Sequence, residues 1–345
     1  MVKVGIIGAT GYVGIELLSY LLRHQKVQVV GISSKSFKDM KISDIYKNLL
    51  KISDLICEDE DAVIEKSEVI FAALPHGLSE KIASKLIDSK KVLIDIGADF
   101  RLSDEGDYIK YYNKKYSDKE LHKKAIYCIP ELHREKVNKQ MIIANPGCYP
   151  TSISLGLGPA ITNDIIVENS IIIDAKSGVT GAGKVANDNT HYVDCNENLK
   201  PYALGGTHRH TPEIEEVLSS LSDRKYQITF TPHLIPVNRG ILSTIYFNLK
   251  INISVEAIYK KYCEYYKNEK FIVILPVGDV ANIKLARNSN YCYISIHKDE
   301  RCNRCIIVST IDNMVKGAAG QAIQNMNLRF GFDEDMGIDM IPKIF

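Results

Sequence analysis

A set of three glycines near the start of the chain constrains its fold more than any other feature. The segment Gly8-Ala-Thr-Gly-Tyr-Val-Gly14 follows an apolar run at residues 2–7 and precedes an amphipathic run at residues 12–23. A glycine-rich turn between a strand and a helix lets the backbone approach a pyrophosphate, whose charge then lies at free N–H groups of the helix. The alternative is a tight turn that only packs the helix on the strand. We predict dinucleotide contacts from Gly8, Thr10, Gly11, Tyr12, Val13 and Gly14.

The residues after the second apolar run, at 27–32, indicate which dinucleotide is bound. An Asp or Glu at this place would bind the ribose 2′-hydroxyl of NAD. The chain instead has Ser33, Ser34 and Lys35, two hydroxyls and a cation that suit the 2′-phosphate of NADP. A polar surface turn is the alternative interpretation. We therefore predict NADP as the cofactor, with Pro75, in the loop after a later strand, beside its path.

Short apolar runs alternate with helical stretches through the first half of the chain. This order is typical of a parallel sheet that helices cover on both faces. The strands are expected at residues 2–7, 27–32, 69–73, 92–96 and 142–144, and the helices at 12–23 and 78–86.

The pattern changes after Tyr149, where the apolar runs alternate with polar residues or are β-branched. The segments between them often do not return as single crossover helices, which favours a mixed α+β domain with a largely antiparallel sheet. The strands of this second domain are expected at 171–176, 226–231, 243–249, 291–296 and 305–310. The fold class is therefore α/β, a Rossmann-type domain followed by a mixed α+β domain. We expect a last helix at residues 312–328 and a solvated surface segment at 108–124, which is rich in lysine.

Composition excludes several classes of partner. Lys and Arg number 43 against 42 Asp and Glu, so bulk charge gives no reason to expect nucleic acid or a membrane surface. No uncharged apolar run reaches the ~18 residues of a membrane span, and the first residues do not look like a signal peptide. The one C-x-x-C pair, Cys302 and Cys305, lacks the second pair of a zinc site, so we expect no metal. A cytoplasmic protein is the prediction.

Cys148 is the candidate nucleophile. It lies in Asn145-Pro-Gly-Cys-Tyr-Pro-Thr151, between the two halves, where proline and glycine restrict the backbone. The cysteine would follow a strand and precede a helix, and a helix N-terminus lowers the pKa of a thiol and stabilises its thiolate. A buried structural cysteine is the alternative, and it suits the other seven cysteines better.

A thiolate mechanism needs a group that transfers protons. His208 and His210 lie in the glycine-flanked segment Gly205-Gly-Thr-His-Arg-His-Thr-Pro-Glu213, and three such charged or imidazole groups are rare in a core. The sequence does not decide which of the two histidines transfers the proton. Glu213 could orient a histidine or bind the substrate, and Thr211 is a candidate cap for a helix at 212–221. A cap-and-turn surface loop is the alternative.

Cations and hydroxyls for an anionic substrate occur in loops after strands. Arg101 and Arg239 have the planar donor geometry that suits a carboxylate or a phosphate, with surface ion pairs as the alternative role. Substrate contacts are expected from Arg101, Asn145, Glu213 and Arg239. The loop Lys176-Ser-Gly-Val-Thr-Gly-Ala-Gly183 supplies further pocket residues, of which Ser177 and Gly178 are assigned to the cofactor.

Six of these segments together resemble the aspartate-semialdehyde dehydrogenase superfamily and, within it, the N-acetyl-γ-glutamyl-phosphate reductases of arginine biosynthesis. The resemblance runs from the first strand to the last helix, and the cysteine and histidine segments are its specific part. The segments are Gly8–Gly14, Ala98–Leu102, Asn145–Thr151, Lys176–Gly183, His208–His210 and Asp312–Gln321.

The resemblance implies reduction of an acyl phosphate to an aldehyde with NADPH and release of phosphate. It implies that Cys148 forms a thioester, and we assign the acid–base role to His210, with His208 second. It also implies that the chain returns to the first domain near its end, where Asn313 touches the cofactor. The domains are then 1–147 with 313–345 and 148–312, and the protein is a homodimer or homotetramer. Lys35 stands where an arginine is common, which weakens the evidence for NADP.

Three other functions remain open from the sequence. An aspartyl-phosphate reductase shares the glycine turn and the cysteine, but its pattern has a histidine near the place of Arg239-Gly-Ile-Leu242. A reductase of a carrier-protein-linked aminoadipyl or glutamyl phosphate would favour a basic face, against which the balanced charge argues mildly. A non-catalytic NADP sensor would need neither the thiol nor the paired histidines.

Overall fold

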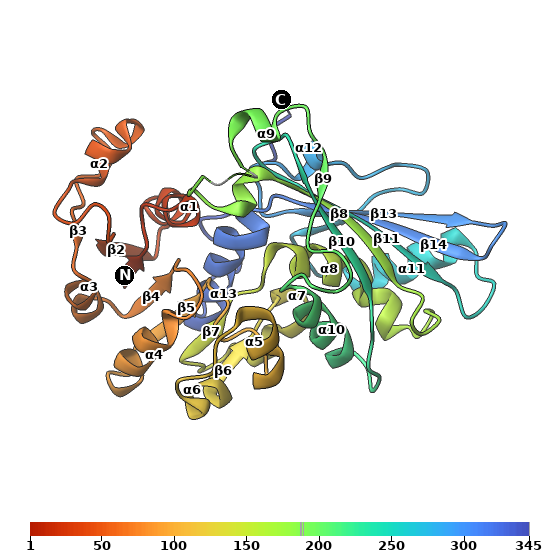
Figure 1. Ribbon diagram of the computed structural model, residues 1–345, viewed down its shortest axis with the longest axis horizontal. Helices are drawn as coiled ribbons and strands as arrows, with labels where there is room; N and C mark the ends of the chain where they lie inside the picture. The colour runs from red at the N-terminus through yellow and green to blue at the C-terminus, as the bar shows by residue number, and fades with distance from the viewer. Residues whose placement is uncertain (187, 189, 345) are drawn as a thin grey trace. The chain divides into compact units, whose positions relative to one another are not determined.

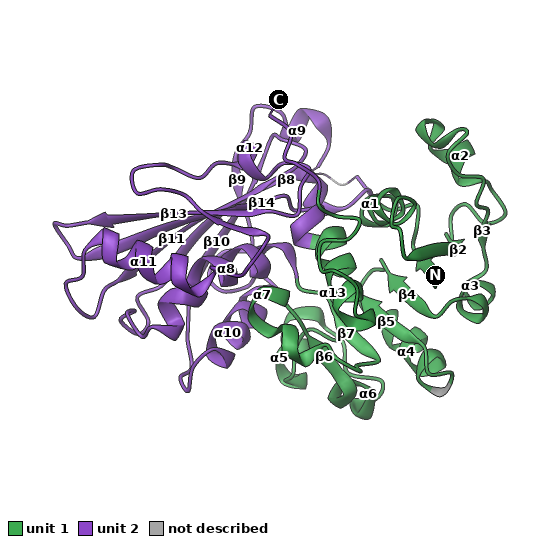
Figure 2. Ribbon diagram, turned by 180° about the vertical axis from the view of Figure 1, so that it is seen from behind, with its two compact units in different colours: residues 1–146, 318–339 green, residues 147–317, 340–345 purple. Residues whose placement is uncertain are grey.

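A computed structural model of the chain describes residues 1–186, 188 and 190–344. The chain forms two compact units, coloured green and purple in Figure 2. Unit 1 comprises Met1–Pro146 and Ala318–Asp339, and unit 2 comprises Gly147–Gly317 and Met340–Phe345. The sequence predicts a return to the first domain at residue 313. Residues 313–317 instead group with unit 2, because the Asn313 side chain accepts a hydrogen bond from the Gly240 backbone of that unit.

Unit 1 is built on a seven-stranded sheet in the order β3-β2-β1-β4-β5-β7-β6, with every pair parallel. The central strands β1, β4 and β5 are almost continuously apolar and buried, as expected for a parallel sheet covered on both faces. The strands are β1 (Val2–Ile7), β2 (Val27–Ser33), β3 (Cys57–Glu58), β4 (Val69–Ala72), β5 (Val92–Asp95), β6 (Ala125–Tyr127) and β7 (Ile142–Ala144).

Helices cover both faces of the unit 1 sheet (Figure 1). Helix α1 leads from β1 to β2, whereas α3 and α4 connect strands in the opposite direction, and right-handed crossovers place these two sets on opposite faces. Helix α13, from the far end of the chain, packs beside α1. The helices are α1 (Tyr12–Leu21), α2 (Ile42–Ile45), α3 (Glu60–Lys66), α4 (Ser79–Asp88), α5 (Glu105–Tyr112), α6 (Lys119–Lys124), α7 (Pro130–His133) and α13 (Gly320–Phe330), with 3-10 turns at Lys47–Leu49 and Arg134–Lys136.

Unit 2 is built on a mixed seven-stranded sheet in the order β12-β13-β14-β11-β8-β10-β9. The pairs β12–β13 and β8–β10 are parallel and the other pairs are antiparallel. The strands are β8 (Ile172–Gly178), β9 (Lys200–Pro201), β10 (Thr229–Ile235), β11 (Ile241–Asn248), β12 (Ile272–Ile274), β13 (Cys292–Asp299) and β14 (Arg304–Ile311). The two sheets confirm the predicted fold class.

A long buried helix, α8 (Cys148–Thr162), packs on the sheet of unit 2 against β11 and β14. Gly156 permits this close approach, because a Cβ there would lie 2.9 Å from the Ile245 side chain. Tyr262 also holds α8, because its hydroxyl donates to the Gly156 carbonyl oxygen at 2.8 Å. The remaining helices are α9 (Tyr192–Cys195), α10 (Thr211–Ser220), α11 (Val255–Tyr265) and α12 (Ile283–Ala286), with a 3-10 turn at Val179–Ala182 and a π-helix at Val315–Ala319.

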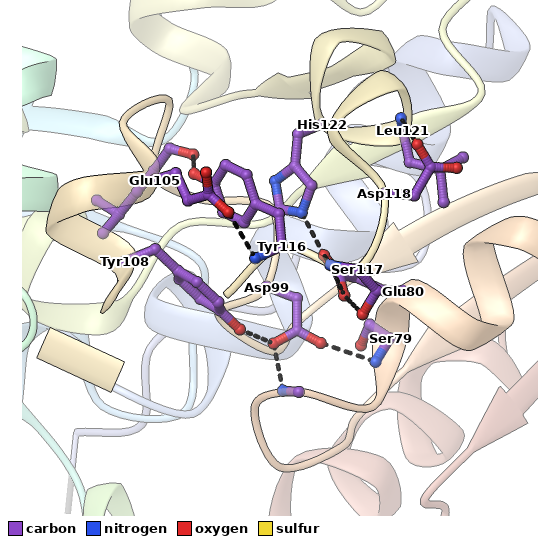
Figure 3. A network of polar contacts seen from close by, with 12 residues as sticks. Ser79, Glu80, Asp99, Glu105, Tyr108, Tyr116, Ser117, Asp118, Leu121 and His122 are labelled. Carbon is purple, nitrogen blue, oxygen red and sulfur yellow. Dashed lines mark hydrogen bonds and ion pairs between the residues drawn. The ribbon is translucent and has the colours of Figure 1, made fainter. Parts of the chain in front are cut away.

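Most residues of the segment 108–124 are exposed, as predicted, and these include all of its lysines. One of its buried residues is Tyr108 in α5, whose hydroxyl donates to the Asp99 carboxylate at 3.0 Å (Figure 3). Two other local predictions were wrong. Thr211 is the first residue of α10 rather than its cap. The last helix is divided, because the Asp312 carbonyl oxygen accepts from Gly317, five residues on, in the π-helix.

Candidate active site

The glycine turn of unit 1 leaves no room for side chains where it folds back on itself. Gly8 has φ of +85°, and a Cβ there would overlap the Ala73 carbonyl oxygen. A Cβ on Gly14 would overlap the Gly8 carbonyl oxygen. At Gly11 the nearest atom to a Cβ is 3.5 Å away, an ordinary contact. The turn therefore needs glycine at positions 8 and 14, and the first backbone N–H groups of α1 follow it without a side-chain cap from any described residue.

The end of β2 lies against this turn. The backbone N–H groups of Gly8 and Ala9 donate to the Ser33 carbonyl oxygen at 3.1 and 3.0 Å. The Thr10 and Ser34 hydroxyls are 2.6 Å apart in a buried hydrogen bond, whereas Lys35 is exposed. Residues 33–38 include no carboxylate. A turn that carries hydroxyls and one cation and leads into a helix N-terminus fits a dinucleotide with an additional phosphate.

The other predicted cofactor residues of unit 1 lie at the rim of this turn. Tyr12 is exposed, Val13 is partly exposed and Pro75 is exposed in the loop after β4. That loop is fixed by the buried Asp99 carboxylate, which accepts from the backbone N–H groups of Gly77 and Ser79 (Figure 3). Asp99 thereby replaces the missing cap of α4.

In unit 2 Cys148 is the first residue of α8 and is partly exposed. A helix N-terminus stabilises a negative charge such as that of a thiolate. The turn before it is held by Glu213, a buried carboxylate that accepts from the Gly147 backbone N–H at 2.8 Å. Gly317 packs from the other side, because a Cβ there would lie 2.7 Å from the Cys148 Cβ. The backbone around Cys148 is therefore held from both sides.

His208 and His210 lie together beside Tyr149, the residue after Cys148. Their ring centroids are 4.9 Å apart, and both side chains are 7% exposed. The His210 backbone N–H donates to Nδ1 of His208 at 3.0 Å, which leaves the proton of neutral His208 on Nε2. Burial and the neighbouring Arg209 lower the pKa of His208 to about 4, so this ring is neutral at pH 7.

A further set of residues in unit 2 surrounds the end of β8. Arg239 pairs with the buried Asp312, with Nε 3.0 Å from Oδ2. The Asn313 amide accepts from the Gly240 backbone N–H at 2.7 Å and donates to Thr180 at 2.9 Å. Ser177 is buried, and a Cβ on Gly178 would lie 2.8 Å from the Arg239 backbone nitrogen.

Arg101 and Asn145 belong to unit 1. The Arg101 guanidinium donates to the carbonyl oxygens of Asn145 and Ile96, both at 2.9 Å. The Asn145 side chain is fully buried and bonds to the Ala318 carbonyl oxygen and to Asn325, each at 3.2 Å. These contacts give Asn145 a positioning role at the end of β7.

Sequence reasoning missed Tyr149 and Asp312. The Tyr149 hydroxyl donates to the His233 carbonyl oxygen at 3.1 Å, and its ring packs against both histidines. Tyr149 follows Cys148 directly, so its place in that motif was the available signal. Asp312 was assigned to a helix start, although a charged residue between an apolar strand and Asn313 was a signal for a buried partner.

The residues that the structure describes contain neither a candidate metal centre nor a candidate membrane span. Within the described ranges, no three His, Cys, Asp or Glu side chains gather closely enough to hold a metal ion. None of the helices in the part of the chain that the structure describes has the length and apolar character needed to span a bilayer.

Two family models match the chain. One is described as semialdehyde dehydrogenase, NAD binding domain, and matches residues 3–140. The other is described as semialdehyde dehydrogenase, dimerisation domain, and matches residues 148–313. The glycine turn lies in the first match, and Cys148, His208 and His210 lie in the second.

Full-length relatives decide the family. An N-acetyl-gamma-glutamyl-phosphate reductase of Clostridium beijerinckii is 55% identical over 345 residues, and 100% of each chain is covered. The chain belongs to the N-acetyl-gamma-glutamyl-phosphate reductase family. Reductases of the same name from Clostridium botulinum and Brachyspira hyodysenteriae are 54% and 51% identical, again with 100% of each chain covered. The resemblance drawn from the six sequence segments is thus confirmed.

Solved structures of more distant proteins share the fold. Aspartate semialdehyde dehydrogenase II of Vibrio cholerae matches with a TM-score of 0.74 at 18% identity, covering 95% of this chain and 98% of that one. Aspartate semialdehyde dehydrogenase of Candida albicans, solved with NADP, matches with a TM-score of 0.73 at 16% identity and the same coverage. At these sequence identities the two comparisons show that the fold is shared.

Proposed function

We propose that this chain reduces N-acetyl-γ-glutamyl phosphate to N-acetyl-glutamate 5-semialdehyde with NADPH and releases phosphate, as a step of arginine biosynthesis. Membership of the reductase family over the full length supports the reaction. The single structural observation that carries it is Cys148 at the N-terminus of a buried 15-residue helix, in a turn bound by Glu213 and close to two histidines.

NADP is the proposed cofactor, and the turn of unit 1 fits it. We assign the pyrophosphate to the start of α1, where Gly8, Gly11 and Gly14 carry no side chain that would block its approach, and the 2′-phosphate to the Ser33, Ser34 and Lys35 group. When bound, NADPH supplies the hydride that converts a thioester to a thiohemiacetal. The remaining assigned contacts are Thr10, Tyr12, Val13, Pro75, Ser177, Gly178 and Asn313.

In the proposed reaction the Cys148 thiolate attacks the γ-acyl carbon. A carbon–sulfur bond forms, the bond to the phosphate oxygen breaks, and phosphate leaves with the electron pair. The helix N-terminus stabilises the thiolate both before the attack and when sulfur departs as the aldehyde forms. Glu213 keeps this turn in place through the Gly147 N–H group.

His210 is the proposed acid–base group. His208 has one ring nitrogen engaged by the His210 backbone, and its pKa of about 4 makes it a weak base at neutral pH. A group that donates and accepts protons near pH 7 needs a pKa closer to that value. His208 then acts as a positioning residue that holds the His210 backbone.

Anionic groups of the substrate are assigned to Arg239 and Arg101. The partial exposure of the Arg239 side chain, 18%, leaves part of its guanidinium accessible while Asp312 holds the rest. Arg101, whose guanidinium is permanently charged, is held in place by hydrogen bonds to two carbonyl oxygens. Asn145, with its buried amide, positions the chain before Cys148.

The proposed enzyme is a homodimer or homotetramer in the cytoplasm. The match of residues 148–313 to a dimerisation domain supports assembly through unit 2. None of the eight cysteines, which all lie within the described residues, forms a disulfide, as expected in a reducing compartment.

The reverse reaction tests the function. The protein is mixed with NADP⁺, phosphate and either N-acetyl-glutamate 5-semialdehyde or aspartate semialdehyde, beside the Cys148→Ser variant. We expect NADP⁺ reduction that depends on phosphate, prefers the acetylated substrate and disappears in the variant. Preference for aspartate semialdehyde would favour the aspartyl-phosphate reductase. If neither aldehyde reacts while NADP⁺ still binds, the carrier-linked reductase or the sensor replaces this proposal.

A further inference from the structure

We propose that Asp312, which lies just after β14, is a positioning residue that controls two parts of the active site at once. Its buried carboxylate orients Arg239 for the anionic substrate and also sets the turn that packs against Cys148. This inference rests on the proposed function, because that function gives Arg239 and Cys148 their roles.

The Asp312 carboxylate receives hydrogen bonds from three separate segments of unit 2. Arg239 donates from Nε and Nη2 to Oδ1, each at 3.2 Å. The backbone N–H groups of Met314 and Val315 donate to the same oxygen at 2.8 and 3.2 Å. The backbone N–H of Asn288 donates to Oδ2 at 2.7 Å. Both oxygens of a fully buried side chain are therefore used as acceptors.

The bonds to Arg239 fix the direction of its guanidinium. Arginine recognises carboxylates and phosphates through a planar set of donors, so the orientation of that plane decides which donors face a ligand. Asp312 engages Nε and Nη2, and the side chain is 18% exposed. A buried carboxylate partner also keeps the arginine from folding back onto the surface when no substrate is present.

The bonds to Met314 and Val315 fix the start of the π-helix Val315–Ala319. The Gly317 backbone N–H donates to the Asp312 carbonyl oxygen at 3.0 Å, which closes the wide turn. Gly317 is the residue whose position leaves no space for a Cβ beside Cys148. Asp312 thus determines how closely the chain approaches the nucleophile, through both its side chain and its main chain.

An amide cannot replace this carboxylate. Asparagine has the same size but offers one acceptor oxygen and one NH₂ donor. In either orientation its NH₂ would face N–H groups, either that of Asn288 or those of Arg239, Met314 and Val315. In Asp312→Asn the N–H donors of one segment or the other therefore lose their acceptor. Unpaired donors in a buried place destabilise the fold.

The test compares Asp312→Asn with a matched control in the reverse reaction. Asp299→Asn, at the end of β13, also removes an Asp–Arg pair, here with the exposed Arg301 and outside the site. We expect Asp312→Asn to raise KM for the semialdehyde or for phosphate by about ten- to hundredfold, and the control to keep wild-type values. Arg239→Gln should raise KM for the same substrate, and the double variant should match Arg239→Gln within about threefold.

A second readout follows Cys148 without any substrate. The rate of iodoacetamide alkylation of Cys148 is measured at pH 10, where most thiols are ionised and access dominates. We expect at least threefold faster alkylation in Asp312→Asn, because Gly317 is released from its place beside Cys148, and no change in Arg239→Gln. This readout is independent of turnover, so it still tests Asp312 if the wild-type protein fails to use the semialdehyde and the proposed function falls.

Two results would overturn the proposal. One is Asp312→Asn with wild-type KM values and a wild-type alkylation rate. The other is a double variant whose KM effects multiply, because Asp312 would then not act through Arg239.

If Asp312→Asn does not fold, Asp312→Glu keeps the charge and moves the carboxylate by one methylene. A folded Asp312→Glu with unchanged KM values and alkylation would contradict the proposal as well, and raised KM would support it.

Discussion

The turn after β1 in unit 1 and the turn before α8 in unit 2 both lead into a helix N-terminus, but they are held in different ways. The turn after β1 is shaped by backbone against backbone, with Gly8 against Ala73 and Gly14 against Gly8. The turn before α8 is held by residues remote in sequence, with Glu213 on the Gly147 N–H and Gly317 against Cys148. The first turn is shaped by main-chain contacts alone, whereas the second also depends on the side chains of Glu213 and Cys148.

This difference follows from what each turn does in the proposed reaction. Holding a phosphate needs N–H groups and space, and the main chain supplies both. Transferring a proton needs a group with a suitable pKa, which only a side chain in a defined environment supplies. We therefore expect substitutions in unit 1 to act through shape, and those in unit 2 to act through chemistry.

The largest expected effect separates the two histidines of unit 2. His210→Asn should lower kcat about 100- to 1,000-fold, because it removes the proposed acid–base group. His208→Asn should lower kcat less than about tenfold, because an asparagine side chain can still accept from the His210 backbone N–H. Steady-state rates in both directions measure the difference. If His208→Asn is the inactive variant and His210→Asn retains turnover, the two roles are reversed.

A comparison within the glycine turn tests the role of shape in unit 1. Gly14→Ala should destabilise the protein by about 1–3 kcal/mol and weaken NADP⁺ binding at least tenfold, because its Cβ overlaps the Gly8 carbonyl oxygen. Gly11→Ala should cost less than about 1 kcal/mol, since its Cβ has room. Urea unfolding and a binding titration give both quantities. Equal losses in the two variants would mean that close backbone packing is not what the turn requires.

Acid should weaken both units through buried histidines, above all His133 in unit 1 and His208 in unit 2. Burial lowers the pKa of His208 and of His133 to about 4 from the usual 6.5. The folded state disfavours the charged form of these rings, whereas the unfolded chain takes up the proton near pH 6.5. Each histidine therefore lowers the free energy of unfolding as the pH falls from 6.5 towards 4, by at most about 3 kcal/mol. Asp95, with its pKa raised to about 6 by burial, acts in the opposite sense between pH 4 and 6.

Comparison of variants isolates the histidine contribution to this dependence on pH. His208→Asn should lose less unfolding free energy between pH 7 and 4.5 than the wild-type protein does, while His191→Asn, an exposed histidine of unit 2, should behave as wild type. An unchanged dependence in His208→Asn would show that this ring is not kept neutral by the fold.

The smallest expected effect concerns the choice between dinucleotides. Lys35→Glu should raise KM for NADPH roughly tenfold and leave KM for NADH nearly unchanged, because it places a negative charge near the additional phosphate. Lys51→Glu, also at an exposed lysine of unit 1, is the matched control. A loss shared equally by NADPH and NADH would move the 2′-phosphate away from Lys35.

Much of unit 1 could be predicted because its information is local. Gly8 to Gly14, the buried strand before them and the serines after β2 lie within the first 34 residues, and period and spacing identify them. The burial of Tyr108 was not predicted. The lysines of the segment 108–124 dominate its composition, whereas the burial of Tyr108 depends on Asp99, which lies in a loop after a different strand.

The site in unit 2 was predicted by residue type but not by arrangement. Cys148, His208 and Glu213 were recognisable as reactive groups, and the structure brings them to one end of α8 and α10. Which group binds the Gly147 N–H, and which ring nitrogen of His208 is engaged, depends on contacts between residues more than 60 positions apart or on a single backbone turn. Asp312 was missed for the same reason, since its partners come from three segments.

The most direct test of the proposed chemistry is to trap the acyl group on the enzyme. Wild-type protein is mixed with N-acetyl-γ-glutamyl phosphate without NADPH, and phosphate release and the mass of each cysteine peptide are measured together. We expect one phosphate per active site and one N-acetyl-glutamyl thioester, located on the Cys148 peptide and absent from Cys148→Ser. Phosphate release without an acylated cysteine, or acylation of one of the other seven cysteines, would contradict Cys148 as the nucleophile.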